Sequence, residues 1–173
     1  MKRLFLFVLL LSMSIGAAAQ KSPFHKGYRG DVSLGGSIGI TKDVRNDAFS
    51  FSTTHGYSYG DGFFIGAGLG LNVLTSEGFT IPVYATAKYN FLDKELSPFV
   101  DCRIGGEALV QDGDTGLAFI TSPGLGVDFR RFSFRAAYLC EVGRFTERAP
   151  VLPTQVTTLF KSHSFQITMG ISF

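Results

Sequence analysis

The sequence predicts an all-β protein, a single eight-stranded antiparallel up-and-down barrel of the transmembrane type. From Gly27 onward nearly every segment alternates apolar and polar residues with a period of two, and no segment has a convincing 3.6-residue stripe. Short stretches rich in turn-forming residues separate these segments at regular spacing. Eight antiparallel strands at such spacing favour an up-and-down barrel.

The N-terminal residues predict a secretory signal peptide over residues 1–19. Lys2 and Arg3 precede an apolar run, and small residues end at Ala19, where cleavage is expected. The apolar run is too short to span a bilayer as a helix. The barrel domain is therefore expected to cover residues 20–173.

The charge balance gives no reason to expect a nucleic-acid partner. The chain has 16 Lys and Arg against 14 Asp and Glu, and removal of Lys2 and Arg3 leaves 14 of each sign. The roughly 150 residues that remain are enough for one small barrel.

The first four predicted strands each end at a turn-forming stretch. The first strand alternates Val32 and Leu34 with Asp31 and Ser33 and ends at "TKDVRND". The next three end at "SYGDG", "TSEG" and "LDKE". The predicted bounds are 28–40, 48–57, 63–74 and 79–91.

The last four predicted strands are separated by two short turns and one long connection. The turns are "QDGD" and "RR", and the long connection begins at Phe145 and ends at Lys161. The predicted bounds are 96–110, 116–129, 132–144 and 164–173. The last of these strands places five apolar residues on one side: Phe165, Ile167, Met169, Ile171 and Phe173.

Alternation alone does not say which face of the barrel lies inside, because lipocalin-like barrels and outer-membrane barrels are reversed. The polar face has few charges for a surface in water, five of each sign, but enough for a polar interior. These ten residues form the expected lumen charge network: Arg29, Asp31, Lys88, Asp101, Arg103, Glu107, Asp128, Arg130, Arg135 and Glu141.

Two further patterns favour a polar interior and an apolar exterior. The polar face also contains glycines, which relieve crowding inside a narrow barrel: Gly66, Gly68, Gly70, Gly105, Gly124 and Gly126. The apolar face has aromatic residues at one end, where an interfacial girdle is expected: Tyr28, Tyr57, Phe63, Tyr89, Phe91, Phe129, Phe132 and Phe173. Phe99 departs from the pattern, since it falls on the inward phase.

The alternating glycines do not indicate a dinucleotide site. Leu71 stands where the third glycine of that fingerprint would be needed, and no helix follows. Cys102 and Cys140 fall on the apolar phases of non-adjacent strands, so they are expected to be buried free thiols.

The chain resembles the small eight-stranded outer-membrane β-barrels of the OmpA/OmpX-like "porin family" type that are common in Bacteroidota. The stretches that support this resemblance are "FSTTHGYSYGDGFFIGAGLG", "IPVYATAKYNF", "LSPFVDCRIGG", "FITSPGLGVDF" and "MGISF". The resemblance implies a barrel in the outer membrane of a Gram-negative bacterium. It also implies that the terminal Phe173 and the alternating residues before it are an assembly signal for the barrel-assembly machinery.

Enzyme motifs are weak in this sequence. Ser37 lies in a G-x-S-x-G pattern, "GGSIG", but no strand–turn–helix elbow surrounds it. A Ser-His-Glu set at the rim would combine His163 with Ser162 or Ser164 and with Glu141. Rim serines are ordinarily solvated, so no catalytic residue is assigned.

The other histidines suggest no metal centre. His55 is expected on the outward phase near the membrane boundary, and His25 precedes the barrel. Three scattered histidines predict neither a metal site nor a cofactor site.

The expected protein is an integral outer-membrane barrel with both termini in the periplasm and no enzymatic activity. Its expected role is structural, adhesive or accessory at the cell surface, in contact with outer-membrane lipid and lipopolysaccharide. The alternative is a barrel-type acyl hydrolase or transferase that modifies lipid A.

Two expectations concern the lumen and the loops. Asp128 is expected to pair with Arg135, and Lys88 with Asp101, so that a filled lumen excludes general diffusion. The long connection from Phe145 to Lys161 contains Pro150 and exposed apolar residues, so it is the expected site for a surface protein partner.

Overall fold

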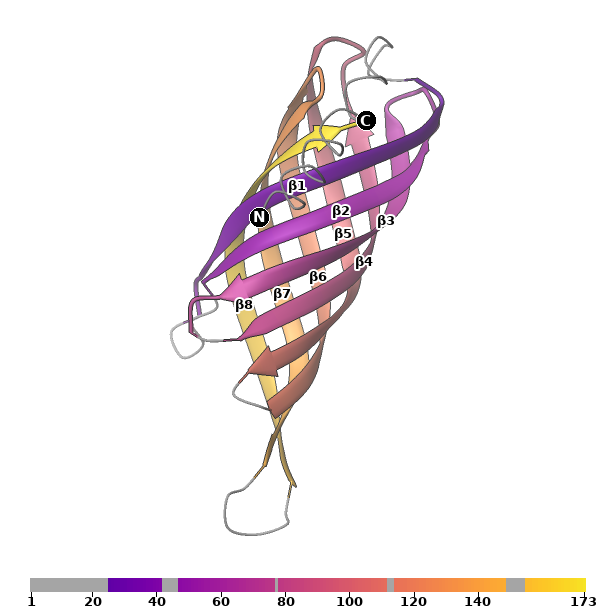
Figure 1. Ribbon diagram of the computed structural model, residues 1–173. Coiled ribbons are helices and arrows are strands. Elements are labelled where there is room, and N and C mark those ends of the chain that lie inside the picture. Colours follow the sequence, from indigo (N-terminus) through magenta and orange to yellow (C-terminus); the bar gives the residue numbers. More distant parts are fainter. Residues whose placement is uncertain (1–24, 42–46, 77, 112–113, 149–154) are drawn as a thin grey trace, which may run out of the picture.

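Eight antiparallel strands form a closed barrel in which each strand pairs with its neighbours in sequence and β1 pairs with β8 (Figure 1). The structure, a computed structural model, describes residues 25–41, 47–76, 78–111, 114–148 and 155–173, so the predicted signal peptide lies outside the described residues. The strands are β1 (Gly27–Gly39), β2 (Ala48–Ser58), β3 (Phe63–Leu74), β4 (Phe79–Asn90), β5 (Leu96–Gln111), β6 (Asp114–Phe129), β7 (Phe132–Arg148) and β8 (Gln155–Ser172). The predicted fold class and the number of strands are confirmed.

The predicted strand bounds agree with the structure to within a residue or two except in β7 and β8. The segment expected to be a long loop is mostly an extension of these two strands, with Phe145 opposite Thr158 and Arg148 opposite Gln155. The reason is local: residues 155–158 include the β-branched Val156, Thr157 and Thr158, which favour strands. Residues 149–154, with both prolines of the connection, lie outside the described residues.

The two ends of the barrel differ. At one end lie the three short connections β2–β3, β4–β5 and β6–β7, together with the start of β1 and the end of β8; we call it the turn end. At the other, the hairpin end, β7 and β8 continue past the wall formed by the other strands (Figure 1).

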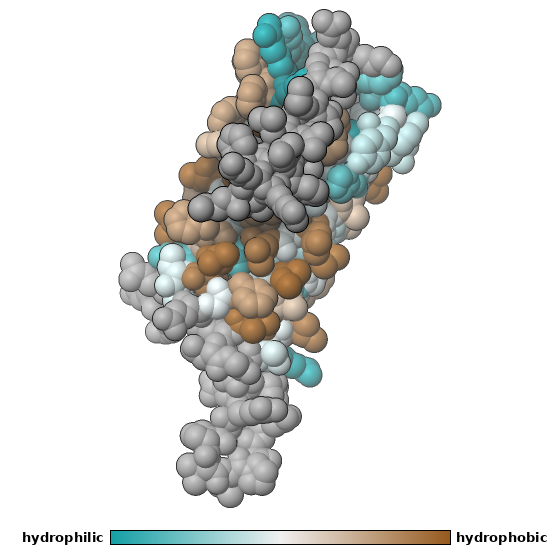
Figure 2. All heavy atoms as spheres, viewed as in Figure 1, coloured by the Kyte–Doolittle hydropathy of each residue, from teal (hydrophilic) through white to brown (hydrophobic). Residues whose placement is uncertain are grey.

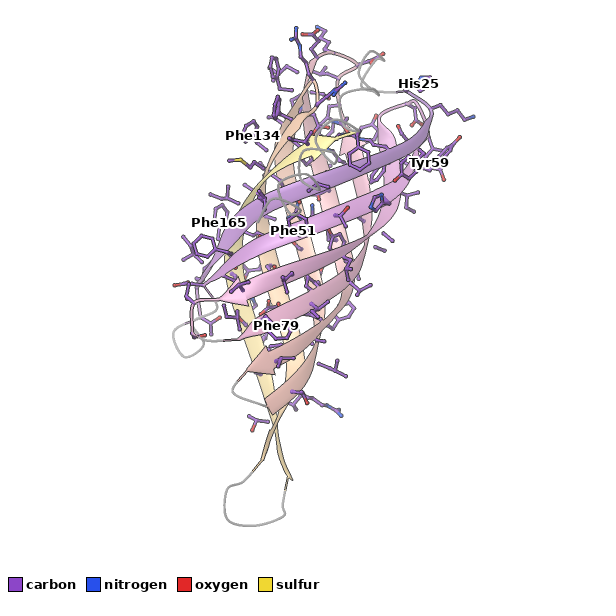
Figure 3. The ribbon with its side chains drawn as sticks, in the orientation of Figure 1. His25, Phe51, Tyr59, Phe79, Phe134 and Phe165 are labelled. Atoms are coloured by element: carbon purple, nitrogen blue, oxygen red, sulfur yellow. The ribbon has the colours of Figure 1, made fainter. Side chains whose placement is uncertain are left out.

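Burial alternates along the strands, with polar residues inside and apolar residues outside. In β4 every second residue is buried, including Thr80, Tyr84, Thr86 and Lys88, while Ile81 and the other intervening residues are exposed. Apolar residues cover the middle of the outer wall on the face seen in Figure 2. The labelled Phe51, Phe79, Phe134 and Phe165 project outward from this wall (Figure 3).

Lumen glycines make room for large inward side chains. A Cβ on Gly66 would lie 2.8 Å from the Phe64 ring, and one on Gly68 would overlap the Tyr84 ring. A Cβ on Gly126 would lie 2.5 Å from the ring of Phe99. The predicted role of these glycines, relief of crowding in a narrow lumen, is confirmed at these positions.

The predicted aromatic girdle is present at the turn end. All eight of its residues are exposed on the outer wall, and several face one another across the strands: Tyr28 opposite Tyr57, Phe63 opposite Tyr89, and Phe129 opposite Phe132. Among the described residues, no helix is long and apolar enough to cross a membrane.

Candidate functional site: the lumen network and the outer wall

Asp128 is the centre of a charge cluster inside the turn end of the barrel. Its carboxylate accepts hydrogen bonds from Lys88 Nζ at 2.8 Å, Asn90 Nδ2 at 2.9 Å and Arg29 Nη2 at 3.1 Å. Lys88 is buried and its ammonium also lies 3.7 Å above the centre of the Phe99 ring. Three donors from two other strands therefore satisfy one buried carboxylate.

Arg135 forms a second cluster, closer to the middle of the lumen. Its Nε donates to both oxygens of Asp101, at 2.7 and 2.9 Å, and its Nη2 donates to the carbonyl and hydroxyl of Ser122. Nη1 donates to Gln166 at 3.1 Å, and the guanidinium side chain is only 4% exposed. Arg103 Nε lies 3.7 Å from the same Asp101 carboxylate.

The predicted partners within this network were wrong: Arg135 binds Asp101 and not Asp128, and Lys88 binds Asp128 and not Asp101. Each pair joins strands that are separated by one strand, although Lys88 lies directly opposite Asp101 in the register. Gly124 leaves the space in which Arg135 reaches Asp101, because a Cβ at this position would lie 2.5 Å from Asp101 Oδ1. Phe99 occupies the space beside Lys88, whose chain passes over the ring toward Asp128.

The prediction that Arg130 faces the lumen was also wrong. Arg130 lies in the tight β6–β7 turn with a positive φ of 56°, and its side chain is 65% exposed. It pairs with the equally exposed Glu95 at 3.2 Å and covers the Phe129 ring. The turn directs the side chain out of the barrel, where strand alternation no longer applies.

An apolar layer crosses the lumen above these charges, and sequence analysis did not anticipate it. Tyr84, Ile120 and Leu139 form a buried cluster, with Arg103 stacked 4.9 Å from the Tyr84 ring. Ile120 and Leu139 fall on the inward phase of their strands, so the alternation predicts that they face the lumen. Most other inward residues are polar, so the sequence pattern did not indicate an apolar layer.

Glu107 and Glu141 lie in the lumen on the hairpin side of this layer, as expected. Both are buried, and their carboxylates are close enough to interact electrostatically. Asn72 Nδ2 donates to Glu107 Oε1 at 3.3 Å and to Thr80 Oγ1 at 3.0 Å. The lumen therefore holds two charged regions with an apolar layer between them.

A small cavity lies among the lumen charges. It measures about 30 Å³ and is bordered by Asp31, Lys88, Asp101, Arg103 and Arg135. That volume holds about one or two water molecules. Asp31 faces it with Oδ1 buried and without a partner among the described residues, so a water molecule at this position would satisfy the carboxylate.

The structure does not assemble the Ser-His-Glu set considered from the sequence. Ser162, Ser164 and Glu141 are buried on the lumen side of the wall, whereas the ring of His163 lies on the outer side. His163 Nδ1 is 2.9 Å from the Tyr138 hydroxyl, and the two rings are stacked. Ser37 lies within β1 with no strand–turn–helix elbow, so it also lacks the geometry of a nucleophile.

The cysteines lie on the outer wall. Cys102 and Cys140 are free thiols as predicted, but both are half-exposed, so the expectation that they are buried was wrong. Both side chains point outward from the barrel wall and not into the lumen.

His55 lies in the girdle, as expected. Its Nδ1 is 2.5 Å from the Tyr28 hydroxyl, and its ring meets Phe173 edge-on. The five alternating apolar residues at the end of β8 all face outward: Phe165, Ile167, Met169, Ile171 and Phe173.

Neither a family model nor a curated protein matches this sequence. Solved structures do match its fold. The outer membrane enzyme PagL superimposes with a TM-score of 0.55 at 13% identity, over 82% of this chain and 98% of that one. The N-terminal β-barrel domain of Pseudomonas aeruginosa OprF gives 0.52 at 14%, over 86% and 100%. Neisserial surface protein A gives 0.50 at 11%, over 89% and 100%. The fold is therefore that of the small outer-membrane β-barrels.

Proposed function

We propose that this chain is an integral protein of the bacterial outer membrane with a structural or interaction role at the cell surface. The exposed apolar wall supports membrane insertion, because residues such as Leu34, Leu69 and Leu125 are more than half exposed along the middle of the barrel. In the proposed orientation the turn end and both termini face the periplasm, and the hairpin end faces the outside.

The observation that contributes most to the proposed role is the filled lumen. From the two charge clusters, the apolar layer and the cavity of only about 30 Å³ among the charges, we infer that the described part of the barrel has no continuous passage for a solute. A general diffusion pore requires an open aqueous channel. We therefore propose a role that depends on the protein surface and not on transport through the barrel.

The β7–β8 hairpin is the proposed site of a surface protein partner. Residues Glu147 and Arg148 of β7 pair only with β8 in the described ladder, so this part of the hairpin stands clear of the other strands. Leu159, close to the projecting segment, is 72% exposed. An exposed apolar side chain beside a projecting hairpin suits protein binding.

Crosslinking in intact cells tests the hairpin. A variant in which residues 146–158 are replaced by a tight turn should keep the barrel, seen as a mobility change between unboiled and boiled samples on a gel. It should lose any surface crosslink, and Leu159→Ser should weaken the same crosslink. A crosslinked partner that survives both changes would place the interaction elsewhere.

The proposal includes the absence of enzymatic activity, and the lipid A-modifying alternative is tested separately. PagL, one of the similar structures, is described as an enzyme. The residues considered for such chemistry here lie on opposite sides of the wall. Mass spectra of lipid A from a deletion strain should match those of the parent; a change in acyl chains would favour the enzyme.

A further inference from the structure

The outer wall is hollowed where β8, β1 and β2 meet. A groove of about 470 Å³ lies there on the outside of the barrel. Its apolar lining comes from all three strands: Leu34, Ile38, Phe49, Phe165, Ile167 and Met169. Phe134 of β7 also lines it, and Figure 3 shows Phe134 and Phe165 projecting outward from the wall.

The hollow exists because Gly36 places no side chain on the outer wall. Gly36 lies opposite Phe49 of β2 and opposite Ile167 of β8, so a missing side chain stands between two large ones. A Cβ at Gly36 would meet only the Ala48 carbonyl oxygen, at 3.3 Å. The space is therefore open to the outside of the barrel.

Two polar residues lie at one end of the groove; Ser37 and Thr168 also border it, but both lie on the inward phase of their strands. Asp47 and Thr75 line its edge at the hairpin end, where the β1–β2 and β3–β4 connections lie. Thr75 donates from its backbone nitrogen and from its hydroxyl to the Asp47 carbonyl, and Asp47 Oδ1 accepts from the Gly39 nitrogen. These hydrogen bonds fix Asp47 and Thr75 in place as a polar rim at the hairpin end of the apolar groove.

We propose that this groove binds one acyl chain of a membrane lipid, with the polar part of the lipid at the rim near Asp47. The inference rests on the proposed membrane insertion, since the groove is continuous with the apolar wall that lipid would cover. Its volume lies within the roughly 300–1,000 Å³ that is typical of small-molecule sites. An apolar chain with a polar end matches the distribution of polar and apolar groups along the groove.

A second protein copy fits the groove less well. Around the described barrel every strand is paired on both sides, so no free edge is available for strand addition. The groove runs over Gly36, between the large side chains of Phe49 and Ile167, so a flexible chain can enter it where a neighbouring wall of bulky residues cannot.

Photolabelling in vesicles tests the site. The protein is inserted into phosphatidylcholine vesicles that contain a small fraction of phosphatidylcholine with a photoreactive diazirine in one acyl chain. After irradiation, labelled peptides are mapped by mass spectrometry. Peptides from β1, β2 and β8 should be labelled several-fold more than peptides from the wall of β4 and β5.

Two matched variants separate the groove from the wall in general. Gly36→Leu fills the groove and should remove the excess label, and Gly36→Ala should reduce it less. Gly106→Leu adds the same side chain on the outer wall of β5, where a Cβ would meet only the Ala118 carbonyl at 3.8 Å. It should leave the excess label unchanged.

Each outcome decides the proposal. Equal labelling of all strands in inserted protein, or excess label that persists in Gly36→Leu, would overturn the acyl-chain site and leave membrane insertion intact. Crosslinked dimers that Gly36→Leu abolishes would assign the groove to a second copy. Failure to insert, with no heat-dependent mobility change, would refute both proposals.

Discussion

Replacing Arg135 with methionine should strongly destabilise the barrel. Arg135 is buried and donates to Asp101, Ser122 and Gln166. Methionine fills a similar volume but leaves the Asp101 carboxylate buried, and its remaining ion pair among the described residues is the one with Arg103 at 3.7 Å. Breaking a buried ion pair by removing one partner costs about 3–5 kcal/mol. We expect the free energy of unfolding to fall by an amount in this range.

Arg130→Met is the matched control for this variant. It removes the same charge from a pair whose two side chains are 65% and 66% exposed. Exposed pairs contribute roughly 0–1 kcal/mol, so the change in stability should be within that range. A double variant, Arg135→Met with Asp101→Leu, should regain part of the lost stability, because the buried carboxylate is then gone. The rescue is partial, since Arg103 loses its nearby carboxylate.

Stability can be measured by urea titration of the folded barrel in detergent micelles or vesicles. The sequence has no tryptophan, so the folded fraction is best followed by gel mobility without boiling and by circular dichroism. Unfolding must be reversible for the comparison to hold. If Arg135→Met and Arg130→Met lose the same small amount, the buried network does not stabilise the barrel as argued.

Three further predictions concern the lumen and the assembly of the barrel. Gly124→Val should destabilise by about 1–3 kcal/mol through overpacking against Asp101 and Arg135, whereas Gly106→Val, in open space, should change the urea midpoint little. In planar bilayers the protein should give no stable porin-size conductance steps; their appearance would show that the described lumen opens. Deleting Phe173 should reduce the yield of assembled barrel in cells more than it reduces the stability of refolded protein. Equal losses in both measurements would argue that Phe173 acts through its packing against Gly30 and His55 alone.

The alternation of residue types determined most of the architecture. The number of strands, the polar interior and the aromatic girdle followed from the period of two and the spacing of the turns. Even the inward Phe99, which is 2% exposed, followed from phase alone. A strand that is half lipid-facing and half lumen-facing leaves a strong local pattern, because successive side chains point to opposite faces.

The tertiary structure decided which charges meet and which residues stay apart. Arg135 and Asp101 are two strands apart, and their contact depends on Gly124 between them, which no local pattern reveals. The rim residues His163 and Glu141 are close in the register, yet the wall separates their side chains. The groove over Gly36 likewise needs three strands to exist. Sequence periodicity fixes the face of a side chain, but a contact across a closed barrel depends on the diameter, the register and the volume of every side chain between the partners.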